Sequence, residues 1–439
     1  MNFKLQIRRI LLGTTLSVLG ALVAHAQPAA PAVVFAGVTQ ANTPLGPGGF
    51  PAFDAAFYGN QLLLLGEAHG VQRPQEIDLA LLKHLNERAG VRTFVAEIDC
   101  AEAYYLNEYL RTGDEATLDL VFRSWIAETA QRANQDFRIK FQQIRVWKQT
   151  LPRRRQIRFL GLDELQDLPL AADYITALLR NQSLLPTLRS RIDSVVVLLR
   201  QLAAPTLAGV ARRAVRDLAA QEAACRRALE TGYDDLRQVL VNVTYDRSGG
   251  MREKNIFANF QRLYRTQHLE REKLYGFWGL QHVLQSPLQG GSTLFASLVR
   301  QSDLPVHNKV VSLMCVFTGC QILMTTGALP PALQESGQRY SRVTQFNHDG
   351  PLVAVVGIEE LKQRTEPGST TLFKLNTPQA ATNQEPIRLS YPLGAPLGQN
   401  MQFKPELPAT AYVQYLLLVR NSLAVQPLLP TVTSATSRQ

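Results

Sequence analysis

Short, uninterrupted apolar stretches recur along the chain, and longer stretches with helical spacing separate them. A continuous apolar run is typical of a strand whose two faces are both covered. Strands that alternate with helices favour a mainly parallel β-sheet flanked by helices, so the expected fold class is α/β. The expected strands are residues 61–66, 92–97, 157–162, 274–279, 309–317, 352–357 and 412–420.

Residues 165–245 depart from this alternation. They are rich in Leu, Ala and Arg at helical spacing and contain no strand-like run. We therefore expect a helical insertion, part of which walls a cleft. The α/β domain that receives the insertion is expected to comprise residues 51–164 and 246–426.

The two ends of the chain differ from its middle. Residues 1–26 combine a basic start, an apolar core and small residues before Gln27, which is the layout of a secretory signal peptide. The alternative, a membrane anchor, is disfavoured because the apolar core is too short to span a bilayer comfortably. We expect an exported protein, periplasmic or secreted, with no stable membrane anchor after signal cleavage. Residues 27–50 are expected to be an extended lead-in, and residues 427–439 a loose tail.

Charge and cysteine content narrow the function classes. The net charge of the chain is +10, and basic residues cluster at 152–158 and 212–230. A basic stripe can bind nucleic acid, but these runs are short and lack a nucleic-acid-binding motif, so we expect solvated surfaces and no nucleic-acid partner. Four cysteines are sparse for a disulfide scaffold, although a bridge between the last two stays open. The cysteines are Cys100, Cys225, Cys315 and Cys320.

Titratable side chains stand at or just after the ends of four expected strands. In a parallel sheet all carboxyl ends lie on one edge, where ligands bind in a crevice. We therefore expect residues from distant parts of the sequence to converge there. They are Glu67 and His69, then Glu97, Asp163 and His282.

Two histidines and three carboxylates suit acid–base chemistry. A histidine near its ordinary pKa is a natural general base at neutral pH, and a neighbouring carboxylate fixes its tautomer. The same set could hold a metal ion, and the spacing does not decide between the two. The chain lacks a zinc-peptidase signature, a serine-hydrolase elbow and phosphate-binding loops. Cys100 is a conceivable nucleophile, but a buried inert thiol is the preferred interpretation.

Each of these residues also has a structural interpretation. His69 could be a locally satisfied histidine at a strand end. Glu97 could pair with Arg92 or Arg73, and Asp163 could cap the next helix.

His282 could instead pack beneath Trp278. Four further histidines have no strand-end context, so we expect them to be structural or to lie on the surface. These are His84, His268, His307 and His348.

The stretch Gly66-Glu67-Ala68-His69-Gly70 resembles a motif of the erythromycin esterase family. Further similarities are "LLKHLNERAGVRTFVAEIDCAEAYYLNEYLRTGD", "FLGLDEL", "MREKNIFANF" and "GFWGLQHVLQ". The resemblance covers roughly residues 55–430. It implies an α/β fold and an esterase or lactonase that opens an ester or lactone with an activated water and no covalent intermediate.

The resemblance also assigns roles by position. It makes His69 the general base, with Glu97 and Glu67 orienting the ring and the water. His282 then lines the same cleft. The candidates for substrate binding are Arg252, Asp163 and Arg73.

The motif departs from the usual family pattern in one respect. Glu67 and His69 are two residues apart, whereas the esterases separate the pair by three. In an extended segment, residues two apart point to the same side. The shorter spacing is similar to that of haem-binding ChaN proteins and their metal-using relatives. The leading expectation is an exported hydrolase of a small ester or lactone, with no metal or cofactor. The alternatives are a haem- or metal-binding protein and a metal-dependent hydrolase on the same fold.

Overall fold

The computed structural model describes residues 38–42, 49–201, 205–247, 250–350, 354–375, 387–390 and 402–430. The expected signal peptide and residues 27–37 and 43–48 of the expected lead-in lie outside the described residues.

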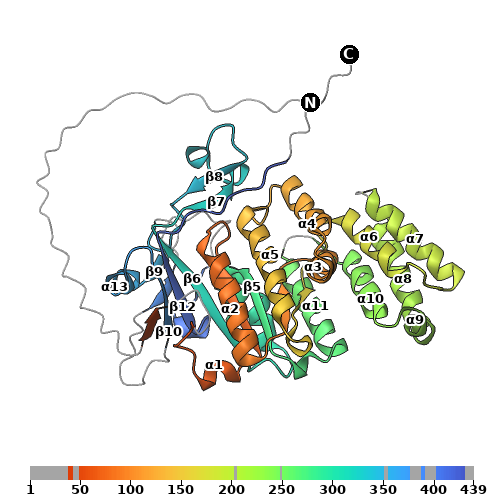
Figure 1. The fold of residues 1–439 in the computed structure, drawn as a ribbon, viewed down its shortest axis with the longest axis horizontal. Helices are drawn as coiled ribbons and strands as arrows, with labels where there is room; N and C mark the ends of the chain where they lie inside the picture. Colours follow the sequence, from red (N-terminus) through yellow and green to blue (C-terminus); the bar gives the residue numbers. More distant parts are fainter. Residues whose placement is uncertain are drawn as a thin grey trace, which may run out of the picture. The chain divides into compact units, whose positions relative to one another are not determined.

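A central sheet of eight strands organises the fold, in the order β1-β10-β12-β6-β2-β5-β3-β4 (Figure 1). Every neighbouring pair from β12 to β4 is parallel, whereas β10 runs antiparallel to both β1 and β12. The expected mainly parallel sheet is thus confirmed. The strands are β1 (Val38–Asn42), β2 (Leu62–Glu67), β3 (Thr93–Ala96), β4 (Arg158–Gly161), β5 (Leu274–Gly279), β6 (Val310–Thr318), β10 (Thr370–Leu375) and β12 (Tyr415–Arg420).

Helices cover both faces of this sheet. In β2, Leu63 and Leu65 pack in one core cluster, and Leu62 and Leu64 pack in another, as the two-residue period of a strand requires. This double burial explains why the strand is a continuous apolar run. The first cluster includes residues of α1 (Ala55–Gly59), α2 (Arg73–Ala89), α3 (Cys100–Thr112), α4 (Glu115–Ala127) and α5 (Gln135–Thr150). The second includes residues of α11 (Arg252–Thr266) and α12 (Phe295–Gln301).

The described part of residues 165–245 is helical, as expected. Its helices gather beside α3 (Figure 1) and share an apolar cluster that also contains Cys100 and Ala101. Gln238 also donates a hydrogen bond to the Gly161 carbonyl, so the insertion is attached to the end of β4. The helices are α6 (Leu168–Leu178), α7 (Pro186–Arg200), α8 (Leu207–Ala220), α9 (Glu222–Leu229) and α10 (Gly232–Val243).

Some strands differ from the sequence expectation. The apolar run at 352–357 contributes β9 (Ala354–Val356), which pairs with β11 (Arg388–Ser390) outside the central sheet. Val356 is half exposed, because a two-stranded sheet covers only part of such a run. A further pair, β7 (Ile322–Thr325) with β8 (Tyr340–Val343), was not expected. Near β9, helix α13 (Ile358–Gln363) adds to a third apolar cluster.

The ends of the described chain are more ordered than their composition indicates. Residues 38–42 of the expected lead-in form β1 and extend the antiparallel edge of the sheet at β10. In the expected tail, the Leu428 N–H donates to the Ala133 carbonyl, while residues 431–439 lie outside the described part.

The four cysteines are buried and free, so no bridge joins Cys315 to Cys320. Burial raises the pKa of the Cys100 thiol well above its ordinary value, and nearby Asp99 adds to this shift. Among the described helices, none is both long and apolar enough to cross a membrane.

Candidate active site

The functional candidates lie beside one another because their strands are neighbours. Glu67 is the last residue of β2, and His69 follows two residues later. Glu97 comes directly after β3, and His282 lies in a short 3₁₀ helix, η3 (Leu280–Val283), directly after β5. Asp163 stands two residues after β4. The sheet order β2-β5-β3-β4 therefore places them in a row along the carboxyl edge.

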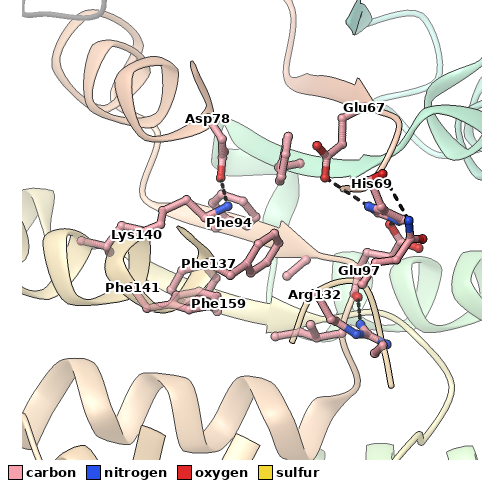
Figure 2. Close-up of a pocket in the computed structure, with 16 residues that line it drawn as sticks. Glu67, His69, Asp78, Phe94, Glu97, Arg132, Phe137, Lys140, Phe141 and Phe159 are labelled. Atoms are coloured by element: carbon pink, nitrogen blue, oxygen red, sulfur yellow. Dashed lines mark hydrogen bonds and ion pairs between the residues drawn. The ribbon is translucent and has the colours of Figure 1, made fainter. Parts of the chain in front are cut away.

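His69 lies between two carboxylates (Figure 2). Its Nδ1 is 3.1 Å from Glu67 Oε1, and its Nε2 is 3.9 Å from Glu97 Oε2. The Glu67 contact favours the tautomer with hydrogen on Nδ1, which leaves the lone pair of Nε2 facing Glu97. The Glu67 side chain is 1% exposed and that of His69 is 42% exposed, so the histidine is the member of the pair that a substrate reaches.

The two glycines of the motif have separate structural reasons. A Cβ at Gly66 would lie 2.4 Å from Val283 Cγ2, so the end of β2 packs directly against η3. Gly70 has φ +99°, and a Cβ there would lie 2.2 Å from the Leu323 carbonyl oxygen. The turn after His69 therefore needs glycine both for its backbone conformation and for space.

A buried polar chain supports Glu67 from within the protein. Gln75 Nε2 lies 3.3 Å from Glu67 Oε1, and Lys140 Nζ donates to Gln75 Oε1 over 2.7 Å. Lys140 Nζ also donates to Asp78 Oδ2 over 2.6 Å, and Tyr275 donates its hydroxyl proton to the other oxygen of Asp78. Helices α2 and α5 thus together fix the carboxylate that orients His69.

Glu97 is held on three sides. Its Oε1 accepts from Arg252 Nη2 over 2.9 Å, and its Oε2 accepts from the Gly279 N–H over 2.6 Å. Arg132 donates to its main-chain carbonyl. Arg252 also forms a two-pronged pair with Asp163, at 3.0 Å from Nε and 2.6 Å from Nη2. Asp163 therefore acts on the site through Arg252, and it does not cap α6, because Asp167 does so.

His282 bridges Glu97 and a residue that the sequence did not single out. Its Nε2 is 3.1 Å from Glu97 Oε1, and its Nδ1 is 2.8 Å from Glu253 Oε1. The ring also packs against Trp278, with centroids 5.5 Å apart. His282 therefore both packs against Trp278 and contacts the carboxylates of the site. Only the adjacency of Glu253 to Arg252 could have indicated its role.

Burial and neighbouring charge shift the pKa values of His69 and Glu67. Packing around the ring disfavours the imidazolium, but the Glu67 hydrogen bond and the Glu97 charge outweigh it and raise the pKa of His69 above its ordinary value. Burial raises the pKa of Glu67, and the His69 contact offsets only part of that shift. A base with a moderately raised pKa is suited to neutral or slightly alkaline conditions.

The second part of the cluster is strongly ionised. Burial opposes charge on His282, yet Glu97 and Glu253 outweigh it and raise its pKa to about 10. Burial would also raise the pKa of Glu97, but His282, His69 and Arg252 hold it well below its ordinary value. These two shifts favour an imidazolium at His282 beside an ionised Glu97.

Gly279 leaves space beside Nε2 of His69. A Cβ at this position would lie 3.1 Å from His69 Nε2 and 3.5 Å from Glu97 Oε2. The backbone N–H of Gly279 meanwhile holds Glu97. The residue therefore combines a hydrogen bond with open space, and a larger residue would lose that space.

Two cavities meet at Glu67, His69 and Glu97. The first, which we call the aromatic cavity, has a volume of about 190 Å³ (Figure 2). Its lining includes Phe94, Phe137, Phe141, Phe159 and Phe277.

The second, which we call the cationic cavity, has a volume of about 320 Å³. Its lining includes Arg252, Gly279, His282 and His348.

His348 was expected to be structural or to lie on the surface, and its buried ring does hold backbone; it also lines the cationic cavity. Its Nδ1 accepts the Phe317 N–H over 3.0 Å, which places any ring hydrogen of the neutral form on Nε2. Burial lowers the pKa of His348 to about 4, so the ring is neutral at pH 7. Because His348 lies in a loop, no pattern in the sequence indicated that it lines a cavity.

Other expected features lie elsewhere. Arg73 pairs with Glu76 over 2.5 Å and lines neither cavity, and Arg92 is 3.9 Å from Glu272. No described residue of 168–245 lines either cavity, so the expected wall comes instead from α5 and the loop before it. The aromatic residues of α5 resemble ordinary core in the sequence, because apolar helix faces are usually buried.

Part of the donor set is already engaged in ion pairs. Glu97 Oε1 is already paired with the Arg252 guanidinium and with the His282 ring. Metal-ligating histidines must be neutral, whereas Glu97 and Glu253 favour the protonated form of His282. In the described part of the chain, no group of three or more His, Cys, Asp or Glu residues is arranged to hold a metal ion.

Comparison with known proteins finds one family over part of the chain. The sequence profile of the erythromycin esterase family matches residues 86–275, which agrees with the resemblance found in the sequence. A comparison with curated proteins finds no match.

Solved structures share the fold at low sequence identity. The chain is similar to a Bacillus cereus protein, with 12% identity, a TM-score of 0.63, and coverage of 90% of this chain and 97% of that chain. It is also similar to a mutant of erythromycin esterase EreC in its open conformation, with 13% identity, a TM-score of 0.60, and coverage of 89% and 99%. A succinoglycan biosynthesis protein has 13% identity and a TM-score of 0.52, with coverage of 84% and 90%.

Proposed function

We propose that this chain, whose residues 86–275 match the erythromycin esterase family, opens an ester or lactone by general-base activation of water. The observation that carries the proposal is His69, which is held between Glu67 and Glu97 where two cavities meet. The buried Cys100, with its raised pKa, is a poor nucleophile, so water is the better candidate.

The attacking water would bridge His69 Nε2 and Glu97 Oε2. These atoms are 3.9 Å apart, and a water about 2.8 Å from each forms a bent bridge between them. As the water oxygen bonds to the carbonyl carbon, its proton passes to Nε2. The tetrahedral intermediate then breaks its bond to the alcohol oxygen, and the proton on His69 passes to that leaving oxygen. Water is thus divided between acid and alcohol.

The charge that develops on oxygen would face the cationic cavity. Arg252 and the His282 imidazolium both line that cavity, and both are fixed by Glu97. Fixed cations that face a developing oxyanion need little reorganisation during the reaction, which lowers its barrier. The same positive charge favours departure of an alkoxide on that side.

The proposal is tested by assaying the purified chain against a panel of simple esters and lactones, with and without a chelator. We expect hydrolysis of at least one class that the chelator leaves unchanged. Intact-protein mass spectrometry during turnover should show no acyl-enzyme. Loss of activity on chelation alone would favour a metal-dependent reaction, and a trapped acyl adduct would exclude direct attack by water.

We also propose that the chain is exported. The basic start, apolar core and small residues of 1–26 support this proposal. Expression in a bacterium that secretes through the same type of signal, followed by fractionation, tests it. We expect mature protein outside the cytoplasm with an N-terminus near Gln27, and full-length protein in the cytoplasm would contradict it.

A further inference from the structure

The aromatic cavity has no assigned occupant, and its lining indicates one. It shares Glu67, His69 and Glu97 with the cationic cavity, and its lining includes five phenylalanine side chains from β3, β4, β5 and α5, four of which Figure 2 labels. Neighbouring rings are mutually tilted, with centroids 5.0 Å apart for Phe94 and Phe159 and 5.7 Å apart for Phe141 and Phe159. Such a lining offers both ring faces and ring edges to a guest, which aromatic groups prefer.

The size of the aromatic cavity limits that guest to one ring. An apolar protein cavity of about 150 Å³ accommodates benzene. The aromatic cavity measures about 190 Å³, which leaves room for a ring and a short link to a carbonyl at His69. A macrocyclic lactone exceeds this volume, so the cavity cannot take the whole of such a substrate.

The polar groups of the aromatic cavity are already satisfied. Lys140 and Asp78, with side chains 5% and 1% exposed, pair with each other over 2.6 Å. Lys140 Nζ also lies 4.0 Å from the ring centroid of Phe137 and 4.4 Å from that of Phe277. These groups therefore do not call for a polar ligand, and the unoccupied contact surface is apolar.

We propose that the aromatic cavity binds the acyl side of the substrate and selects a single aromatic ring, as in an arylacetyl ester. The alcohol side would then face the cationic cavity, where Arg252 and His282 stabilise the departing oxygen. This inference names a substrate class for the function proposed above and rests on that function for its catalytic part. The binding part stands alone.

Binding is measured first, with phenylacetamide, a neutral amide that resembles the ester, and with acetamide, which lacks the ring. Ligand-observed NMR titration of the full chain should show phenylacetamide binding about 10- to 100-fold more tightly, because one ring is buried. Ala96 shares the core cluster of Phe94 and lines the cavity, so Ala96→Leu should fill it and abolish that difference. Phe159→Leu should enlarge it and admit naphthylacetamide, which wild type excludes.

Phe260→Leu is the matched control, because Phe260 is equally buried but packs in the cluster on the opposite face of the sheet. It should leave both titrations unchanged, and thermal melting checks that every variant folds. Hydrolysis is then compared for the 4-nitrophenyl esters of phenylacetate and acetate, each corrected for its uncatalysed rate. We expect kcat/KM to favour phenylacetate by about 10- to 100-fold.

The outcomes separate the two proposals. If phenylacetamide binds and Ala96→Leu removes that binding, but no ester is hydrolysed, the cavity assignment stands and the proposed reaction falls. If esters are hydrolysed without preference for the ring, or if folded Ala96→Leu and Phe159→Leu both bind like wild type, the cavity assignment is overturned.

Discussion

At the scale of single residues, Gly279 is the position where one added carbon should have the largest effect. The Cβ of Gly279→Ala would lie 3.1 Å from His69 Nε2, in the space that the proposed water needs. We expect kcat/KM to fall at least about tenfold with little change in the melting temperature, because misplacement of reacting groups by a fraction of an ångström is costly. Steady-state kinetics with thermal melting measures both.

Gly59→Ala is the matched control, since nothing lies within 4 Å of the added carbon there. It should retain wild-type kinetics. If Gly279→Ala also retains full activity, the space beside Nε2 is not used by the attacking water.

The pH dependence follows from the raised pKa of His69. Only the neutral ring accepts a proton, so activity should rise with pH and level off above a midpoint higher than the ordinary value of 6.5. Glu67 stabilises the imidazolium, so Glu67→Gln should move this midpoint to lower pH and also lower the plateau. Profiles of kcat/KM for both proteins decide the point. A midpoint that does not move, or that moves upward, would assign the ionisation to another group.

The sequence predicted much of this site, because strand-end positions in a parallel sheet converge whatever their distance along the chain. Glu67, His69, Glu97 and His282 do converge. The sequence did not indicate Glu253, His348 or the polar chain behind Glu67. Side chains that helices and loops contribute to a site leave no periodic signal. Arg73, one helical turn from Glu76, pairs locally instead.

At the scale of elements, the Lys140–Asp78 pair joins α5 to α2 beneath the site. Removal of one member leaves a buried, uncompensated charge, which typically costs about 3–5 kcal/mol. We expect Lys140→Met to lower the free energy of unfolding by that order. Addition of Asp78→Asn should restore at least half of the loss, because the orphaned charge is then gone. Urea denaturation of the three proteins provides the measurement.

A loss below about 1 kcal/mol in Lys140→Met, or no recovery in the double variant, would show that the pair does not stabilise this junction. The exposed Gln143→Ala on the same helix is the control, and it should stay within about 0.5 kcal/mol of wild type.

Elements were predictable where burial imposed a strong pattern. Strands β2, β3, β5 and β6 are buried along almost their whole length and have apolar sequences. Strand β10 carries Thr370, Thr371 and Lys374 and lies near the sheet edge, so its pattern is weaker. The run at β9 has a buried-strand pattern but pairs with β11 outside the central sheet, since an apolar run specifies burial and not its partner.

At the scale of the whole molecule, sheet order determines which side chains meet. The neighbours β2, β5, β3 and β4 align His69, His282, Glu97 and Asp163, the carboxylate that anchors Arg252, along one edge. Aromatic residues of helix α5 line the aromatic cavity on one side of that edge, and His348 lines the cationic cavity. The insertion at 165–245 is attached to the end of β4, and none of its described residues lines either cavity.

His69 is proposed to be the base that activates water. The most direct measurement is kcat/KM of wild type and His69→Asn on the best ester or lactone, together with the melting temperature of each. General-base catalysis typically contributes about 10²- to 10⁴-fold, so we expect a loss of that size with the melting temperature nearly unchanged. Full activity in a folded His69→Asn would contradict the account, because the base would then lie elsewhere.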